Sequence, residues 1–221
     1  MGTITRTFAN NITTSGVFKP TAFNNASFDN VTAVPEGAVE GGNMVLLSTQ
    51  TASGSSSISF TTGIDSTYKE YMFIFNNMHP STGAPTFDVN FSIDGGSNYN
   101  VTKTSTWFYA QHYENDASTE FGYDTGQDLA QSTSYQRLGL AIGADGSDKS
   151  GSGILHLYEP SSTTFVKHFM SRFGTVRGDD LQTDVHCAGY CNTTSAINAV
   201  DFKMSSGNID AGTIQMFGVV K

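Results

Sequence analysis

An aromatic and acidic stretch, Trp107–Asp116, holds the side chains best suited to chemistry or recognition. It reads WFYAQHYEND, contains the only tryptophan of the chain, and is followed by Phe121, Tyr123 and Asp124. Flat aromatic rings beside carboxylates and amides are typical of surfaces that hold sugars or partner proteins. The candidate glycan or partner contacts are therefore Trp107, Tyr109, Tyr113 and Tyr123. The alternative is that every second member of the stretch fills the core while the others line a subunit interface.

The remaining candidates for chemistry are weaker. The glycine-rich segment 143–153 lacks the G-x-x-x-x-G-K-[ST] order of a nucleotide loop and the acidic spacing of a calcium loop, so it predicts a hairpin loop. The five histidines occur singly, as is common at cross-strand or interface positions. No serine has the flanks of a nucleophile elbow, and the twenty acidic residues single out no glycosidase-type carboxylate pair. We therefore predict no catalytic residue, no metal site and no cofactor.

Two cysteines, Cys187 and Cys191, stand in the segment HCAGYCN next to His186. On a strand, residues four apart share a face but lie about 13 Å apart, whereas a disulfide needs Cα atoms within about 7 Å. A local disulfide is therefore not expected, and the chain fits a reducing compartment. A metal site with the neighbouring histidine is conceivable; two buried, small apolar side chains are the interpretation we favour.

The elements that must position these residues are strands. Of the 221 residues, 38% are hydrophobic and only 14% are charged, below the roughly 25% usual for soluble domains. No window shows a 3.6-residue period, whereas apolar alternation and turn residues recur from residue 43 onward. The sequence predicts an antiparallel, jelly-roll-like β-sandwich of about 8–11 strands, and the longer polar segment Glu114–Ser134 is expected to be a loop with room for one helical turn. The expected strands are Met44–Thr49, Ser56–Phe60, Lys69–Met78, Thr86–Ser92, Tyr99–Tyr113, Arg137–Ile142, Gly153–Tyr158, Phe165–Ser171, Asp184–Asn192, Ile197–Met204 and Thr213–Val219.

The end of the chain predicts a closing hairpin. Two apolar-rich runs, Ile197–Met204 and Thr213–Val219, flank a segment rich in Ser, Gly, Asn and Asp. We expect them to form antiparallel strands joined by a short connection. The segment Asp94–Asn98, which reads DGGSN, likewise predicts a hairpin turn whose glycines supply positive φ angles. The run Lys69–Met78 is apolar on both faces, which is typical of a central strand between packed layers.

Residues 1–43 differ from the rest of the chain. Their hydrophobic residues are scattered through Asn, Thr and Ser, and the segment ends at a Gly-Gly pair. Such a pattern cannot build a core by itself, because isolated apolar side chains do not offset the entropy of ordering the chain. We expect an extended arm that docks on a neighbouring subunit, followed by a sandwich domain over residues 44–221. The expected anchors of the arm are Phe8, Val17, Phe18, Phe23 and Phe28.

The net charge of −9 argues against nucleic-acid binding, which depends on lysine and arginine side chains that neutralise phosphates. The first residues contain no apolar stretch of the secretory type, and no window has the length and hydropathy of a membrane span. We therefore expect assembly in a cytoplasm, with no membrane insertion.

Four segments carry a resemblance to a known class of proteins: TRTFANNITTSGVF (5–18), YKEYMFIFNNMHPST (68–82), SSTTFVKHFMSR (161–172) and SSGNIDAGTIQMFGVV (205–220). The sequences of these segments resemble those of small virion structural proteins of marine tailed bacteriophages, such as phages that infect cyanobacteria. The resemblance covers nearly the whole chain, including the arm, and carries no active-site residue. It implies a jelly-roll-like subunit on the outside of a capsid or tail, of the decoration, fibre or appendage type, that forms oligomers, often trimers.

Three functions remain open at this stage. The first is a non-enzymatic structural component of a phage particle, located in the virion and docked through residues 1–43 onto copies of itself and other virion proteins. The second is an adhesin that binds a host-surface glycan through Trp107 and the segment Glu114–Ser134. The third is a glycan-degrading enzyme of the tailspike type, which requires two carboxylates in a cleft.

Overall fold

The computed structural model describes residues 44–146 and 148–220, and these residues contain strands and connecting loops without any helix. The twelve strands are β1 (Met44–Thr51), β2 (Ile58–Phe60), β3 (Glu70–Pro80), β4 (Phe87–Ser92), β5 (Lys103–Tyr113), β6 (Thr119–Tyr123), β7 (Gln136–Gly139), β8 (Gly151–Tyr158), β9 (Lys167–Val176), β10 (Leu181–Cys191), β11 (Ala199–Met204) and β12 (Ile209–Val219). The predicted arm, residues 1–43, lies outside the described residues together with its anchors Phe8, Val17, Phe18, Phe23 and Phe28.

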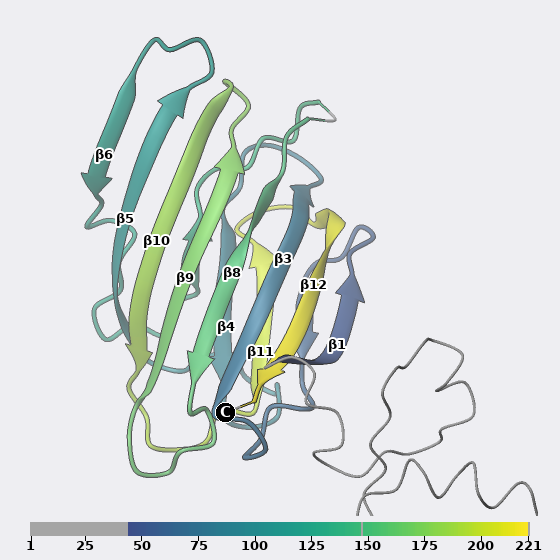
Figure 1. The fold of residues 1–221 in the computed structure, drawn as a ribbon, viewed down its shortest axis with the longest axis vertical. Coiled ribbons are helices and arrows are strands. Elements are labelled where there is room, and N and C mark those ends of the chain that lie inside the picture. The colour runs from purple at the N-terminus through teal and green to yellow at the C-terminus, as the bar shows by residue number, and fades with distance from the viewer. Residues whose placement is uncertain (1–43, 147, 221) are drawn as a thin grey trace, which may run out of the picture. The chain divides into compact units, whose positions relative to one another are not determined.

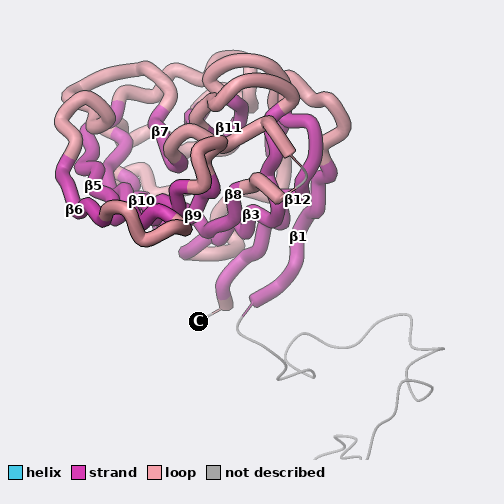
Figure 2. The backbone as a smooth tube through the Cα atoms, turned by 90° about the horizontal axis from the view of Figure 1, so that it is seen from above, coloured by secondary structure: helices cyan, strands magenta, loops and turns pink. Residues whose placement is uncertain are grey.

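The strands form two antiparallel sheets that pack face to face. The larger sheet has the order β1-β12-β3-β8-β9-β10-β5-β6, and the smaller sheet has the order β2-β11-β4-β7. Figure 1 looks onto the larger sheet, with β1 and β6 at its two edges and the smaller sheet behind it. Figure 2 shows the two layers from above. The prediction of an antiparallel all-β sandwich is confirmed.

Strand β9 shows how the sequence produces this arrangement. Its residues alternate between buried and exposed, with Phe169 and Phe173 facing the smaller sheet and His168, Met170 and Arg172 facing outward. Successive side chains of a strand point to opposite faces, so a period of two makes one face apolar. Burying that face against the second sheet is the main driving force for the sandwich.

Six phenylalanine rings form the centre of the core and join the two sheets. Phe202 of β11 lies 5.3 Å from Phe73 and 5.1 Å from Phe75, both of β3, measured between ring centroids. On its own side, Phe202 lies 6.2 Å from Phe60 and 5.9 Å from Phe87. Phe173 of β9 completes the group, at 5.3 Å from Phe87 and 5.7 Å from Phe75. Three of these six pairs, those of Phe202 with Phe60, Phe73 and Phe75, meet edge to face, an arrangement favoured by the ring quadrupole.

Three glycines make room for one of these rings. A Cβ atom at Gly139, Gly151 or Gly153 would lie less than 3.0 Å from an atom of the Phe173 ring. Gly139 belongs to β7, whereas Gly151 and Gly153 belong to β8, which pairs with β9. Gly151 and Gly153, which belong to the glycine-rich segment noted in the sequence, therefore serve core packing instead of loop flexibility.

The predicted closing hairpin is wrong. Strand β11 pairs with β2 and β4 in the smaller sheet, whereas β12 pairs with β1 and β3 in the larger sheet. The connection between them therefore crosses from one layer to the other. The hairpin predicted at Asp94–Asn98 is wrong for the same reason, because β4 and β5 belong to different sheets. The turn itself has the expected glycines with positive φ angles, 72° at Gly95 and 88° at Gly96. Alternation predicts which face of a strand is buried and says nothing about its partner.

The number of strands also differs from the prediction. The additional strand is β6, which lies within the segment Glu114–Ser134 that was expected to be a loop. Its five residues are exposed or half-buried, because it is an edge strand that pairs only with β5. Its apolar alternation is limited to two exposed rings, Phe121 and Tyr123, which is too short a pattern to distinguish a strand from the polar loop around it.

Candidate functional site

The aromatic stretch that the sequence singled out does not form one surface. Trp107 has an exposed fraction of 0% and faces the smaller sheet, so the prediction that it contacts a glycan is wrong. Tyr109 and Tyr113 follow it two and six positions later and point to the same side of β5, where the Tyr109 ring lies 5.6 Å from that of Trp107. Tyr123 is 54% exposed and pairs with Phe108, which points to the opposite face. Strand alternation therefore divides the four residues between two faces.

The tyrosine hydroxyls of this group are engaged with carboxylates. Tyr109 donates to Glu120 at 2.7 Å, Tyr113 to Asp179 at 3.3 Å and Tyr123 to Asp128 at 2.7 Å. The hydrogen bond to Glu120 raises the pKa of Tyr109, and the hydrogen bond to Asp128 raises that of Tyr123. These contacts tie β5 to β6 and both strands to neighbouring loops, and they leave Tyr123, which is 54% exposed, as the member of the group most available to a partner.

Both cysteines are buried in the core, as the favoured interpretation of the sequence predicted. Cys187 and Cys191 are free and buried on the inner face of β10, whereas His186 points outward and stacks on Phe108 with 4.9 Å between ring centroids. The histidine and the thiols therefore lie on opposite faces of the sheet and cannot share a metal ion. Burial raises the pKa of both thiols to about 12.

At pH 8, neither cysteine is expected to react with 5,5′-dithiobis(2-nitrobenzoate) in the folded protein. A pKa of about 12 leaves about one thiol in ten thousand as the reactive thiolate at this pH, and burial blocks the reagent as well. Absorbance of the released thionitrobenzoate measures the reaction, and both thiols should titrate after unfolding in guanidinium. Rapid titration of one thiol in the native protein would contradict the prediction.

Two buried lysines flank Cys191 on the adjacent strands. Lys103 of β5 and Lys167 of β9 both pair with Cys191 across the sheet. The Lys103 ammonium donates to Asn90 Oδ1 at 2.5 Å and to the Val101 carbonyl at 2.7 Å, and burial lowers its pKa to about 8. The Lys167 ammonium donates to the carbonyls of two loop residues, Thr193 at 3.0 Å and Ser195 at 2.7 Å. Both lysines thus satisfy loop and side-chain acceptors at one end of the sandwich, which is a structural role.

The outer face of the smaller sheet is covered by loops. Asp201 of β11 is 3% exposed and accepts hydrogen bonds from Ser59 Oγ at 2.5 Å and from the Tyr135 hydroxyl at 2.8 Å. Burial is the main cause that raises the pKa of Tyr135, and the bond to Asp201 adds to it. Lys203 lies over the Tyr135 ring, with its ammonium 4.0 Å from the centroid. These polar groups are satisfied within the chain, so this face offers little to a partner.

The outer face of the larger sheet is open by comparison. Five of its apolar side chains are neighbours across β1, β12, β3 and β8, and we call them the apolar patch: Leu46, Met72, Ile74, Ile154 and Phe217. Leu46 is 51% exposed and Ile154 is 36% exposed. The patch adjoins edge strand β1, whose first residue directly follows residue 43 of the predicted arm. Both apolar faces of β3 were visible in the sequence; only the fold shows that one of them lacks a covering layer.

The acidic residues of the described part of the chain do not cluster into a metal centre. The most acidic hollow is lined by Glu114, Asp179 and Asp180 beside Tyr113 and Asn115. Asp179 pairs with Arg177 at 3.2 Å, and Asp180 pairs with Lys149. No group of three or more His, Cys, Asp or Glu side chains is placed to hold a metal ion within residues 44–146 and 148–220. A membrane-spanning helix is likewise absent from the part of the chain that the structure describes.

The chain was compared with protein-family models, with curated proteins and with solved structures, and none of the three comparisons found a match.

Proposed function

We propose that this protein is a structural subunit on the exterior of a tailed bacteriophage particle, where it assembles with copies of itself and with other virion proteins. The observation that carries the proposal is the contrast between the two outer faces of the sandwich. Loops cover the polar outer face of the smaller sheet, whereas Leu46 and Ile154 of the apolar patch on the larger sheet are exposed around the buried Met72. The resemblance of four segments to phage virion proteins is the reason for placing the proposed assembly in a phage particle.

Exposed apolar side chains that lie together on one face are typical of protein–protein contact surfaces. The apolar patch joins Leu46, Phe217 and Met72 in one row across three strands, and Ile74 and Ile154 stand opposite each other in the next row. Two ion pairs border it: His156 pairs with Glu70 at 2.6 Å, and Arg172, which stands opposite Ile154, pairs with Asp184 at 2.8 Å. A contact through this patch buries apolar area without leaving unpaired charges, which favours stable association.

The arm contributes the second part of the proposal. Its scattered phenylalanines suit a segment that becomes ordered on another subunit, and its last residue adjoins the strand that carries Leu46. In the particle, residues 1–43 dock on a neighbour while the apolar patch forms the adjoining contact. The protein acts in this role without catalysis.

Light scattering of the purified protein tests this function. The full-length chain is expected to have the mass of a trimer or a larger oligomer, and a chain starting at Asn43 the mass of a monomer. Residues from Gly42 onward form one compact unit with its own core, so the shortened chain should remain folded. A full-length protein that is monomeric at micromolar concentration would contradict self-assembly.

The apolar patch is tested by Leu46→Glu in the full-length chain, which is expected to lower the oligomer mass by placing a charge in the contact. Ile93→Glu is the matched control, because Ile93 is 42% exposed and lies in the loop after β4, outside the patch. Both exposed positions should tolerate the change within about 0.5 kcal/mol of unfolding free energy. Equal masses for the two variants and the wild type would exclude the patch as the contact.

A further inference from the structure

Two adjoining hollows form a groove at one end of the open face. The first has a volume of about 790 Å³ and lies where the β8–β9 loop meets the sheet; the second, of about 410 Å³, continues over β9, β10 and β5. His168 lines both hollows. We call the two together the β9 groove.

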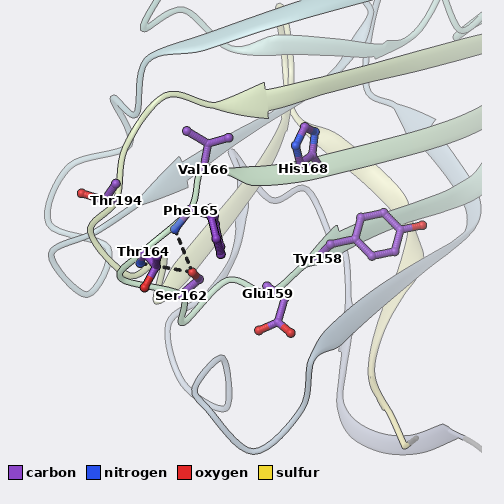
Figure 3. A pocket seen from close by; sticks show the side chains of 8 residues that line it. All are labelled: Tyr158, Glu159, Ser162, Thr164, Phe165, Val166, His168 and Thr194. Atoms are coloured by element: carbon purple, nitrogen blue, oxygen red, sulfur yellow. Dashed lines mark hydrogen bonds between the residues drawn. The ribbon is translucent and has the colours of Figure 1, made fainter.

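Aromatic rings from neighbouring elements line the groove. Tyr158 ends β8, and His168 of β9 stands opposite Tyr190 of β10, with 6.2 Å between the two ring centroids. Phe165 extends from the β8–β9 loop and is 74% exposed. Figure 3 shows Tyr158 and His168 on the two strands, with Phe165 on the loop that joins them. Between the rings, the small side chain of Ala188 leaves space above the sheet at the floor of the groove.

Hydrogen bonds hold the loop that carries the most exposed ring. The Ser162 hydroxyl accepts from the backbone N–H groups of Thr164 at 3.3 Å and Phe165 at 3.1 Å. These bonds appear in Figure 3 as dashed lines. Glu159 begins the same loop and pairs with Lys69 at 3.0 Å. The loop thus presents Phe165 to solvent on a fixed backbone, which lowers the entropy lost on binding.

The opposite wall is held by a chain of amides. Gln131 donates to the Tyr190 hydroxyl at 3.3 Å and to Thr104 Oγ1 at 2.8 Å, and it accepts from Asn192 at 2.6 Å. Tyr190 therefore has a defined position beside the hydroxyls of Thr104 and Thr106. Each wall combines an aromatic ring with polar groups that donate and accept hydrogen bonds.

We propose that the β9 groove binds a neutral oligosaccharide. Aromatic faces pack against the C–H faces of sugar rings, while threonine and serine hydroxyls and the Glu159 carboxylate bond to sugar hydroxyls. Two hollows in succession give room for several sugar units. No lysine or arginine is among the described residues that line the groove, and the chain carries a net charge of −9. Sulfated or uronic-acid polymers are therefore repelled, and the neutral class is selected.

Native gels that contain a soluble polysaccharide test the inference with the full-length protein. The neutral probes are dextran, laminarin, mannan, galactomannan and xylan, and dextran sulfate is the anionic counterpart of dextran. At least one neutral probe is expected to retard the protein, and dextran sulfate is not. The dissociation constant follows from the retardation at several polysaccharide concentrations.

Phe165→Ala and Tyr190→Ala are each expected to weaken the binding about tenfold, in line with the loss of one aromatic contact. Phe121→Ala is the matched control, because Phe121 is 75% exposed on β6 at the far edge of the same sheet. Tyr190→Phe keeps the ring and should retain most of the affinity, which separates the contact from a folding defect in Tyr190→Ala. Melting curves of all four variants identify any loss of fold.

Three results would overturn the proposal. They are no retardation by any neutral probe, retardation by dextran sulfate alone, and retardation that Phe165→Ala leaves unchanged. Light scattering of Phe165→Ala separates this inference from the assembly function. An unchanged mass with weakened binding supports the groove as a saccharide site, whereas a lower mass assigns the groove to contacts between copies.

Discussion

Replacing Phe202 with alanine is expected to lower the free energy of unfolding by about 3–5 kcal/mol, because it leaves a cavity between the two sheets. The Phe202 ring lies within 6.2 Å of four other phenylalanine rings, two from its own sheet and two from β3. Its loss therefore removes contacts within a layer and between layers at once. For a chain of this size, the melting temperature should fall by roughly 10 °C.

Guanidinium denaturation followed by fluorescence measures this effect, since the single tryptophan, Trp107, is buried in the folded state. Phe121→Ala serves as the control, because its ring is 75% exposed and its removal should change stability by less than about 0.5 kcal/mol. The arrangement of the six rings would be wrong if Phe202→Ala cost less than about 1 kcal/mol while the control remained neutral.

Replacing Trp107 with alanine is expected to cost about 3–5 kcal/mol, whereas Trp107→Phe should cost about 1 kcal/mol. The indole is fully buried between β10 and the smaller sheet, so alanine leaves a large cavity. Its Nε1 has no hydrogen-bond partner among the described residues. A buried N–H without a partner is itself unfavourable, and phenylalanine removes that group while it retains most of the ring.

Thermal unfolding followed by circular dichroism measures both variants, which lack the fluorescent reporter. Tyr123→Ala is the control, because Tyr123 belongs to the same predicted contact group and is 54% exposed. If Trp107→Ala left the melting temperature unchanged, the indole would lie at the surface and the original glycan assignment would regain support. If Trp107→Phe were as costly as Trp107→Ala, the Nε1 proton would have a partner that contributes to stability.

The contrast between the two outer faces of the sandwich is the basis of the proposed assembly function. On the smaller sheet, Asp201 and Tyr135 direct their polar groups toward each other beneath the loops. On the larger sheet, Leu46 and Ile154 face solvent with no covering layer among the described residues. An exposed apolar face is maintained in a folded protein when it serves a contact, and the β9 groove lies beside it with a different, polar and aromatic lining.

The sequence by itself determined the class of the fold and the burial of many individual residues. Period-two alternation located eleven of the twelve strands and assigned Cys187 and Cys191 to the core. Both outcomes depend on local geometry, because the side chains of a strand alternate between faces whatever the strand pairs with. The twelfth strand, β6, was not predicted because its alternation is limited to two exposed rings, Phe121 and Tyr123.

Only the tertiary structure decided which strands are neighbours and therefore which side chains meet. Strands β11 and β12 are consecutive in sequence but belong to different sheets, and the aromatic stretch that looked like one binding surface is divided between the core and the exterior. The β9 groove joins Tyr158, His168 and Tyr190 from three strands, and no local pattern connects these residues. Strand pairing is set by long-range packing between faces of similar apolar character, which a one-dimensional periodicity cannot distinguish.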